Sequence, residues 1–278
     1  MITKSLASEH LAVDFGIVFH AWGSLGRALR AMPVLFVSGI VVTGLLTLGA
    51  WKFQAPYHAL LAGAPYPDFV DFSYTLIVDF LDSMVLAAVA IPVHRQILLG
   101  ERRDGLVPLL RARTMDFALW LVVLQMSAFA ALLPLPLLMG ASQARAMTIV
   151  GGMLLLLVVL FVVTVRLSLI FPAIAIDVPA HSPVGRAAAA WTLSRGHFWR
   201  VIVTLVFAVV PLLFLILLAT VAANVLVGVP GATPVSVFDL LMWFEVVVTG
   251  LSRPLAAALA SAVLSWNYKL AVDELKVR

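Results

Sequence analysis

Two aspartates, Asp79 and Asp82, lie three residues apart inside a long apolar stretch. Residues three apart share one face of a helix, so both carboxylates would point in the same direction. A carboxylate inside a membrane is costly unless it is paired, protonated or wetted. The pair therefore predicts either a site for a cation, a proton or a lipid headgroup, or a structural pair bonded to polar neighbours. Intramembrane proteolysis is disfavoured, because its two carboxylates come from facing helices and share a proton.

The last apolar stretch contains a second charged position, Arg253, which precedes Pro254 and follows Glu245 by eight residues. Arg253 could pair with Asp79, Asp82 or Glu245, or it could bind a phosphate, and we favour the ion pair. We take Asp79, Asp82, Glu245 and Arg253 as the candidate polar site within the membrane.

Arginines of the connecting segments form a second candidate site, which would bind anionic lipid headgroups. Its members are Arg102, Arg103, Arg111, Arg113, Arg195 and Arg200. The role of arginines in setting membrane topology also explains these positions.

Motifs of enzymes and metalloproteins do not occur in the sequence. The histidines are scattered, no two are four residues apart, and HExxH, GxSxG, P-loop and GxGxxG patterns are missing. The chain has no cysteine, which excludes disulfides and thiolate ligands. We therefore predict no metal, no cofactor and no enzymatic activity.

The composition predicts the fold class. Of the 278 residues, 63% are hydrophobic and 12% are charged, whereas soluble domains carry roughly 25% charged residues. An all-α, polytopic membrane bundle that forms a single domain is expected. The net charge of +4 then indicates basic loops that face anionic lipid rather than a nucleic-acid partner.

Six stretches are long enough to cross a bilayer, which needs about 20 apolar residues of helix. The predicted spans are residues 33–51, 72–93, 117–139, 147–171, 201–227 and 252–268. Short amphipathic helices in the membrane interface are predicted at 11–31, 104–114, 183–195 and 235–250. For the long last stretch, a single kinked helix is the alternative to an interfacial helix that bends at Pro254 into the sixth span.

Lysine and arginine positions predict the orientation. With six spans, 15 of these residues fall on one side of the membrane and two, Lys52 and Arg145, fall on the other. The positive-inside rule then places both termini in the cytoplasm.

Three segments resemble a known family. They are residues 166–200, the stretch AIPVHRQILLGE (Ala90–Glu101) and the stretch SRPLAAALASAVLSWNYKLAVDEL (Ser252–Leu275). The features that carry the resemblance are Arg166, Phe171-Pro172, Ser182-Pro183, Trp191, Leu193 to Gly196 and Phe198-Trp199.

These features resemble the membrane domain found fused to some glycerophosphodiester phosphodiesterases, which also occurs as stand-alone bacterial inner-membrane proteins. The resemblance implies a six-span bundle and a bacterial inner-membrane location. It does not imply diesterase activity, because that chemistry belongs to a separate soluble barrel. The chain departs from the family pattern at Lys269 and Leu270, which follow Tyr268 where an acidic residue is more typical.

The leading functional hypothesis is a non-enzymatic membrane protein that handles or senses lipids or amphipathic molecules. Membrane lipids would be its partners. An accessory or assembly subunit of a larger membrane complex is the second hypothesis, and a secondary transporter that uses Asp79 or Asp82 is the third.

Overall fold

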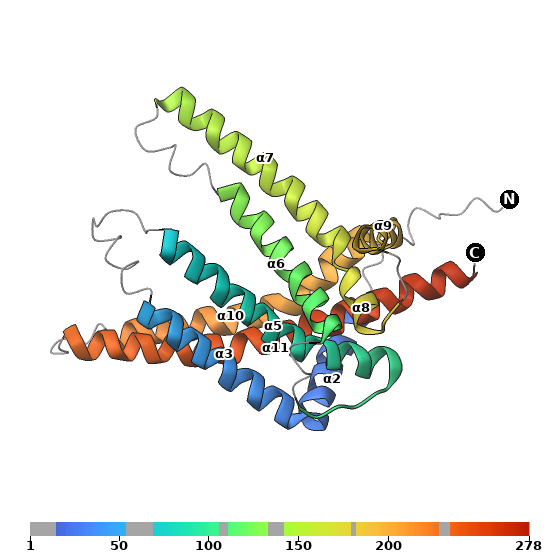
Figure 1. Cartoon of the computed structure of the whole chain (residues 1–278), viewed down its shortest axis with the longest axis horizontal. Helices are drawn as coiled ribbons and strands as arrows, with labels where there is room; N and C mark the ends of the chain where they lie inside the picture. The colour runs from blue at the N-terminus through green and yellow to red at the C-terminus, as the bar shows by residue number, and fades with distance from the viewer. Residues whose placement is uncertain are drawn as a thin grey trace.

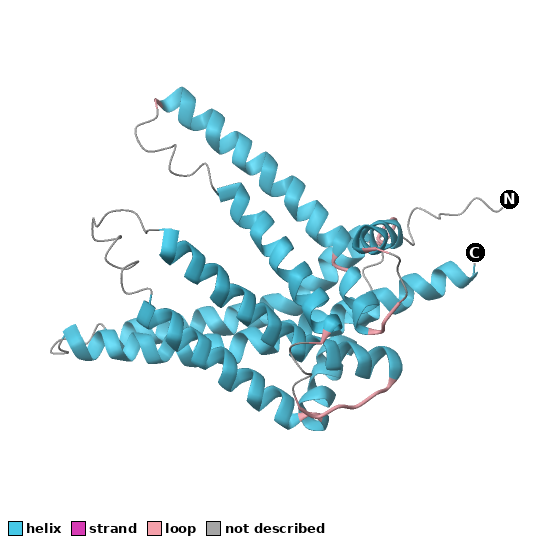
Figure 2. Cartoon of the chain, in the orientation of Figure 1, coloured by secondary structure: helices cyan, strands magenta, loops and turns pink. Residues whose placement is uncertain are grey.

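The computed structural model describes residues 15–53, 69–105, 111–132, 142–178, 182–227 and 234–277. Within these ranges the regular structure is entirely α-helical, as the composition predicts (Figure 2). The helices are α2 (Phe15–Ala31), α3 (Pro33–Phe53), α5 (Phe69–Leu99), α6 (Ala112–Leu132), α7 (Gln143–Leu167), α8 (Ile170–Ala175), α9 (Pro183–Leu193), α10 (Phe198–Val227) and α11 (Pro234–Val277).

Five stretches of the described residues are long and apolar enough to cross a membrane, and they lie in α3, α5, α7–α8, α10 and α11. The third predicted span, residues 117–139, extends beyond the described part of α6. These features define the chain as a multi-pass helical membrane protein.

The predicted division of the last apolar stretch is wrong. Residues 234–277 form one helix with Pro254 inside it, so residues 235–250 are not a separate interfacial helix. Proline removes one backbone hydrogen bond, but neighbouring helices can stabilise a membrane helix through such a position. Here α3, α5 and α10 all pack against α11.

The structure agrees with the other predicted interfacial helices to different extents. In the 11–31 segment, helix α2 occupies residues 15–31, and the residues before Phe15 lie outside the described part. In the 104–114 segment, residues 104 and 105 are not helical and 106–110 are outside the described part. In the 183–195 segment, α9 begins at Pro183, and the Ser182 side chain caps it by accepting a hydrogen bond from the Gly185 amide.

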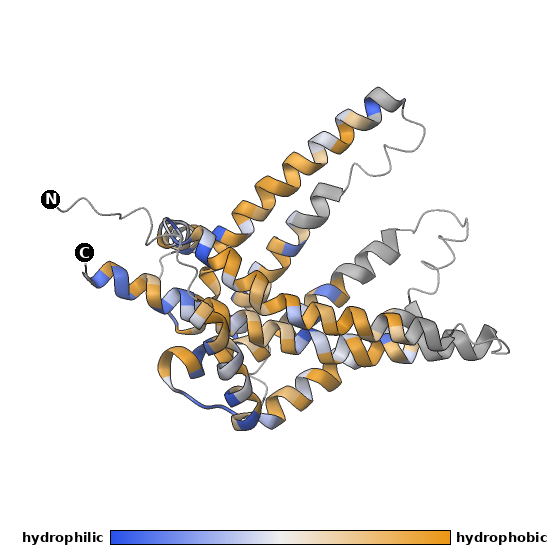
Figure 3. Cartoon of the chain, turned by 180° about the vertical axis from the view of Figure 1, so that it is seen from behind, coloured by the Kyte–Doolittle hydropathy of each residue, from blue (hydrophilic) through white to orange (hydrophobic). Residues whose placement is uncertain are grey.

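Helix α11 is the centre of the bundle and runs beside α3 and α10, with α5 packed against it (Figure 1). The α6–α7 hairpin diverges from this group. Helices α2, α8 and α9 gather where the C-terminal part of α11 emerges, and hydrophilic residues concentrate there (Figure 3). We call this end of the molecule, which holds α2, α8, α9 and the C-terminal part of α11, the basic end.

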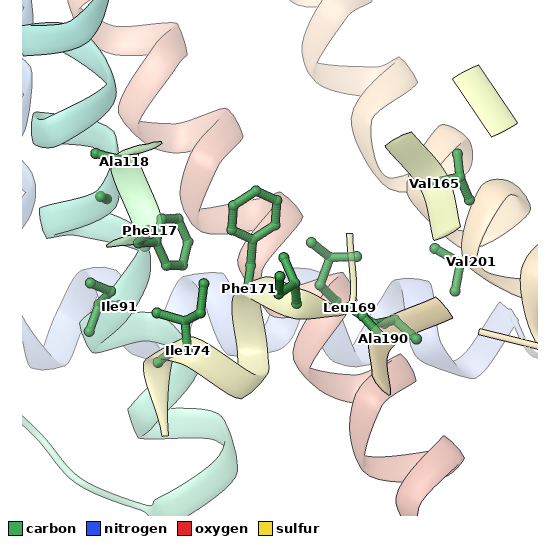
Figure 4. Close-up of a cluster of buried hydrophobic side chains, with 14 of the residues drawn as sticks. Ile91, Phe117, Ala118, Val165, Leu169, Phe171, Ile174, Ala190 and Val201 are labelled. Atoms are coloured by element: carbon green, nitrogen blue, oxygen red, sulfur yellow. The ribbon is translucent and has the colours of Figure 1, made fainter. Parts of the chain in front are cut away.

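The core consists of two groups of buried side chains. One joins α5, α6, α8 and α11, and it includes Phe117 and Phe171, whose ring centroids are 4.7 Å apart (Figure 4). The other joins α2, α3, α5, α10 and α11. Helix α10 is also present in both groups, but α5 and α11 each supply more of the buried side chains, so these two helices form the interior.

Glycines allow α3 and α11 to approach closely. A Cβ atom added at Gly250 would lie 3.2 Å from the Ile40 carbonyl oxygen and 3.3 Å from the Gly44 Cα. Because both neighbours are backbone atoms, larger residues at position 250 would force the two helices apart.

Ion pairs and an aromatic contact connect the helices at the basic end. Asp177, a non-glycine residue with a φ of 57°, pairs with Arg95 and Arg113. The Arg166 guanidinium lies 4.8 Å from the centroid of the Trp191 ring, which brings together two residues that carry the family resemblance.

A loop residue caps helix α3. The Asp104 carboxylate accepts a hydrogen bond of 3.1 Å from the Leu35 amide, across 69 positions of sequence. Only Met32 lies between the end of α2 and the start of α3, and its amide still donates a hydrogen bond to the Ala28 carbonyl. The corner between α2 and α3 is therefore held partly by a segment that follows α5.

Candidate functional site

An ion pair joins α5 to α11 in the interior of the bundle. Nη1 of Arg253 donates to Oδ2 of Asp82 at 2.6 Å. The Asp82 side chain is 8% exposed, whereas that of Arg253 is 49% exposed. The pair therefore has a buried acidic half and an accessible basic half.

A partly open cavity of about 680 Å³ begins at this pair, and we call it the groove. Helices α5, α6, α8, α10 and α11 all contribute to its walls, which are mainly apolar. Leu86 and Ala90 follow Asp82 at four-residue intervals on α5, and Ala257 and Leu264 follow Arg253 on α11. The groove thus extends along both helices from the ion pair toward the basic end.

His94 lines the other end of the groove on the α5 wall. Its side chain is fully buried, and Nδ1 lies 2.7 Å from the Ser265 hydroxyl. Twelve residues separate His94 from Asp82, a distance of about 18 Å along a helix. The groove therefore has a polar group at each end and a mainly apolar lining between them.

Two buried atoms of these groups have no hydrogen-bond partner among the described residues: Oδ1 of Asp82 and Nε2 of His94. An unsatisfied buried polar atom costs about 1–3 kcal/mol. A ligand that offers a hydroxyl or amide to either atom would recover part of this cost on binding.

The structure brings together two of the four residues of the predicted intramembrane site. Asp82 and Arg253 pair with each other, as we favoured. Asp79 is one turn away on α5 and is not among the described lining residues of the groove. Glu245 is exposed and lies about 12 Å along α11 from Arg253.

The six arginines of the predicted headgroup site are dispersed over the basic end. Arg113 pairs with Asp177, and Arg200 pairs with Glu274. Arg102 and Arg195 line two different small pockets. Arg103 and Arg111 are exposed. The structure therefore distributes these arginines over several positions, and their binding of lipid headgroups stays a prediction.

Mutual repulsion is nevertheless present among the arginines at the start of α6. Partial burial lowers the pKa of Arg113, and the charges of Arg95 and Arg111 lower it further. The part of this shift that comes from neighbouring charges shows that Arg95 and Arg111 lie close enough to Arg113 to repel it.

Sequence reasoning missed His94, Ser265 and Gln125, all of which are polar residues of apolar helices. His94 and Gln125 line the groove, and Ser265 contacts His94. A signal was present, since polar residues inside membrane helices generally face the interior. Metal-ligand spacing does not detect His94, because a single buried histidine has no second ligand at the required distance in sequence. In the described residues no group of three histidines or carboxylates could hold a metal ion.

These features define a class: a multi-pass α-helical membrane protein with a mainly apolar groove that has polar groups at both ends. No family model, curated protein or solved structure matches the chain.

Proposed function

We propose that the protein binds one amphipathic molecule of the membrane in the groove and has no enzymatic activity of its own. The observation that carries this proposal is the 680 Å³ cavity whose apolar walls separate two polar ends. Ligand pockets of this kind are typically about 300–1,000 Å³, mostly apolar, with a few polar groups that fix orientation.

The chemistry of the ion pair restricts the polar part of the ligand. Asp82 and Arg253 balance each other in charge, so the ligand needs no net charge. Oδ1 of Asp82 requires a donor, and the accessible side of Arg253 attracts an acceptor. A hydroxyl or an amide meets both requirements, and the apolar part of the ligand would lie against the walls of the groove.

The location that we propose is the inner membrane of a bacterium, with both termini in the cytoplasm. It is supported by the 15-to-2 distribution of basic residues and by the family resemblance. With this orientation, the groove extends from the membrane interior toward the cytoplasmic leaflet.

Blocking the groove tests the function. Ala257→Trp places a large ring inside the groove, and Val158→Trp places the same ring on the exposed surface of α7. The protein is purified in mild detergent, bound lipid is counted by native mass spectrometry, and the affinity for a fluorescent acyl-chain probe is measured. We expect retained lipid in the wild type and in Val158→Trp, and at least about tenfold weaker probe binding in Ala257→Trp, or 1.4 kcal/mol.

Circular dichroism and size-exclusion profiles check that both tryptophan variants are folded. A wild type that neither retains lipid nor binds the probe overturns the proposal. Equal probe affinity in a folded Ala257→Trp variant does so as well.

A further inference from the structure

A second cavity, of about 220 Å³, lies at the basic end between α2, the end of α5 and α11. Its lining includes Arg27 of α2, Gln96 of α5, Trp266 of α11 and Arg102, which follows α5 by three residues. No lining residue is shared with the groove. This cavity, which we call the arginine pocket, is therefore a separate site.

The two arginines bring positive charge that the described surroundings do not neutralise. Neither Arg27 nor Arg102 forms an ion pair with any described residue. The carboxylates next to Arg102 have other partners: Glu101 pairs with Arg95, and Asp104 accepts from the Leu35 amide. None of the residues that line the pocket is acidic.

Ser24 holds two of the lining side chains in place. Its buried hydroxyl accepts a hydrogen bond of 2.9 Å from Nη2 of Arg27 and one of 3.2 Å from Nε1 of Trp266. The Trp266 ring in turn lies 5.3 Å from Nζ of Lys269, which adds another cation nearby. Arg27 is thus positioned before any ligand arrives.

Gln96 contributes a further polar group. Its amide oxygen is buried and has no hydrogen-bond partner among the described residues. Rotation of the amide exchanges its oxygen and nitrogen, so that the NH₂ group can face an anion. The pocket then offers two guanidinium groups and an amide, donors whose geometry suits a tetrahedral oxyanion.

We propose that the arginine pocket binds a phosphate group, as a monoester or a diester. Two sources share this chemistry: an anionic phospholipid headgroup at the membrane surface and a soluble phosphate compound. The pocket lies directly after the last turn of α5, where a membrane helix meets the headgroup region, and this location gives both sources access.

The test compares two double variants that remove the same charge. R27Q/R102Q removes both pocket arginines. R30Q/R103Q removes the exposed arginines nearest to them in sequence, neither of which lines the pocket. R27K/R102K keeps the charge but loses the planar guanidinium groups. Detergent-solubilised protein is titrated with inorganic phosphate by isothermal calorimetry in one arm, and with phosphatidylglycerol by native mass spectrometry in the other.

In at least one arm, we expect R27Q/R102Q to bind at least about tenfold more weakly than the wild type. R30Q/R103Q should stay within about twofold, and R27K/R102K should be intermediate. An effect confined to the phosphate arm identifies a soluble ligand, an effect confined to the lipid arm identifies a headgroup, and an effect in both arms supports the phosphate site for either source.

Equal weakening in the two glutamine variants overturns the proposal, because it would reflect net charge alone. Unchanged binding in R27Q/R102Q, or no binding by the wild type in either arm, also overturns it. Blocking the groove with Ala257→Trp leaves the arginine pocket intact, so either proposal can be overturned without affecting the other.

Discussion

Helices α5 and α11 lie in the interior of the bundle, whereas α7–α8 and α10 lie at its exterior. The apolar stretches of α5 and α11 have mean hydropathies of 1.7 and 1.6, and 67% and 44% of their residues are buried. Those of α7–α8 and α10 have mean hydropathies of 2.9 and 3.2, and only 28% and 17% are buried. The most hydrophobic helices therefore lie outside, and the more polar ones lie inside.

This arrangement follows from the solvent. Lipid tails are as apolar as leucine, so burying leucine in the bundle gains little, and small or polar residues stabilise helix association instead. The buried polar residues of α5 are Asp82, Ser83 and His94, and those of α11 are Ser261, Ser265 and Asn267. The contrast predicts that substitutions in α5 and α11 destabilise the fold, while matched changes in α7 do not.

The largest effect is expected at the ion pair. Arg253→Leu leaves the Asp82 carboxylate buried without its partner, which should cost about 3–5 kcal/mol of unfolding free energy. The double variant D82L/R253L removes both charges and should recover most of this loss. Unfolding in mixed micelles measures both. A double variant as unstable as Arg253→Leu would show that the pair itself, rather than the unpaired charge, matters.

A smaller effect is expected where α3 and α11 approach each other. Gly250→Leu must separate two backbones and should cost about 1–3 kcal/mol. The control is Gly151→Leu on α7, where an added Cβ meets nothing within 4 Å, and it should change stability by less than about 0.5 kcal/mol. Thermal unfolding of the two variants in the same detergent gives the comparison. Equal losses would contradict the assignment of α7 to the lipid-facing exterior.

The smallest effect is expected at Asn267, whose Nδ2 donates to the Thr204 hydroxyl of α10 at 3.0 Å and to the Val263 carbonyl at 2.9 Å. Hydrogen bonds between membrane helices average about 0.6 kcal/mol. A double-mutant cycle of Asn267→Leu and Thr204→Val should yield a coupling of that size. A coupling near zero would mean that this hydrogen bond adds nothing to the association of α10 with α11.

The helical class and the pairing of Arg253 with an acidic residue could be predicted from sequence. The length of the apolar stretches predicts the helical class, and the cost of an unpaired charge in a membrane predicts that Arg253 has a partner. The choice of Asp82 over Asp79 could not be predicted, since one helical turn separates them and only the packing of α5 on α11 decides. The groove could not be predicted either. It forms between five helices, and the spacing of residues within one segment of the sequence does not indicate it. The ion pairs of Arg113 and Arg200 could not be predicted for a similar reason, because Asp177 and Glu274 are 64 and 74 positions away in sequence.

The cap on α3 has a consequence for how the protein is made. The ribosome completes α2 and α3 long before it synthesises Asp104. The Leu35 amide therefore lacks this hydrogen-bond acceptor until α5 has been inserted. Pro33 has no amide hydrogen, which reduces the number of donors left waiting in the first turn. The corner between α2 and α3 is therefore finished only after the first hairpin is in the bilayer, and the arginine pocket beside it is completed later still, once α11 has brought Trp266 into place.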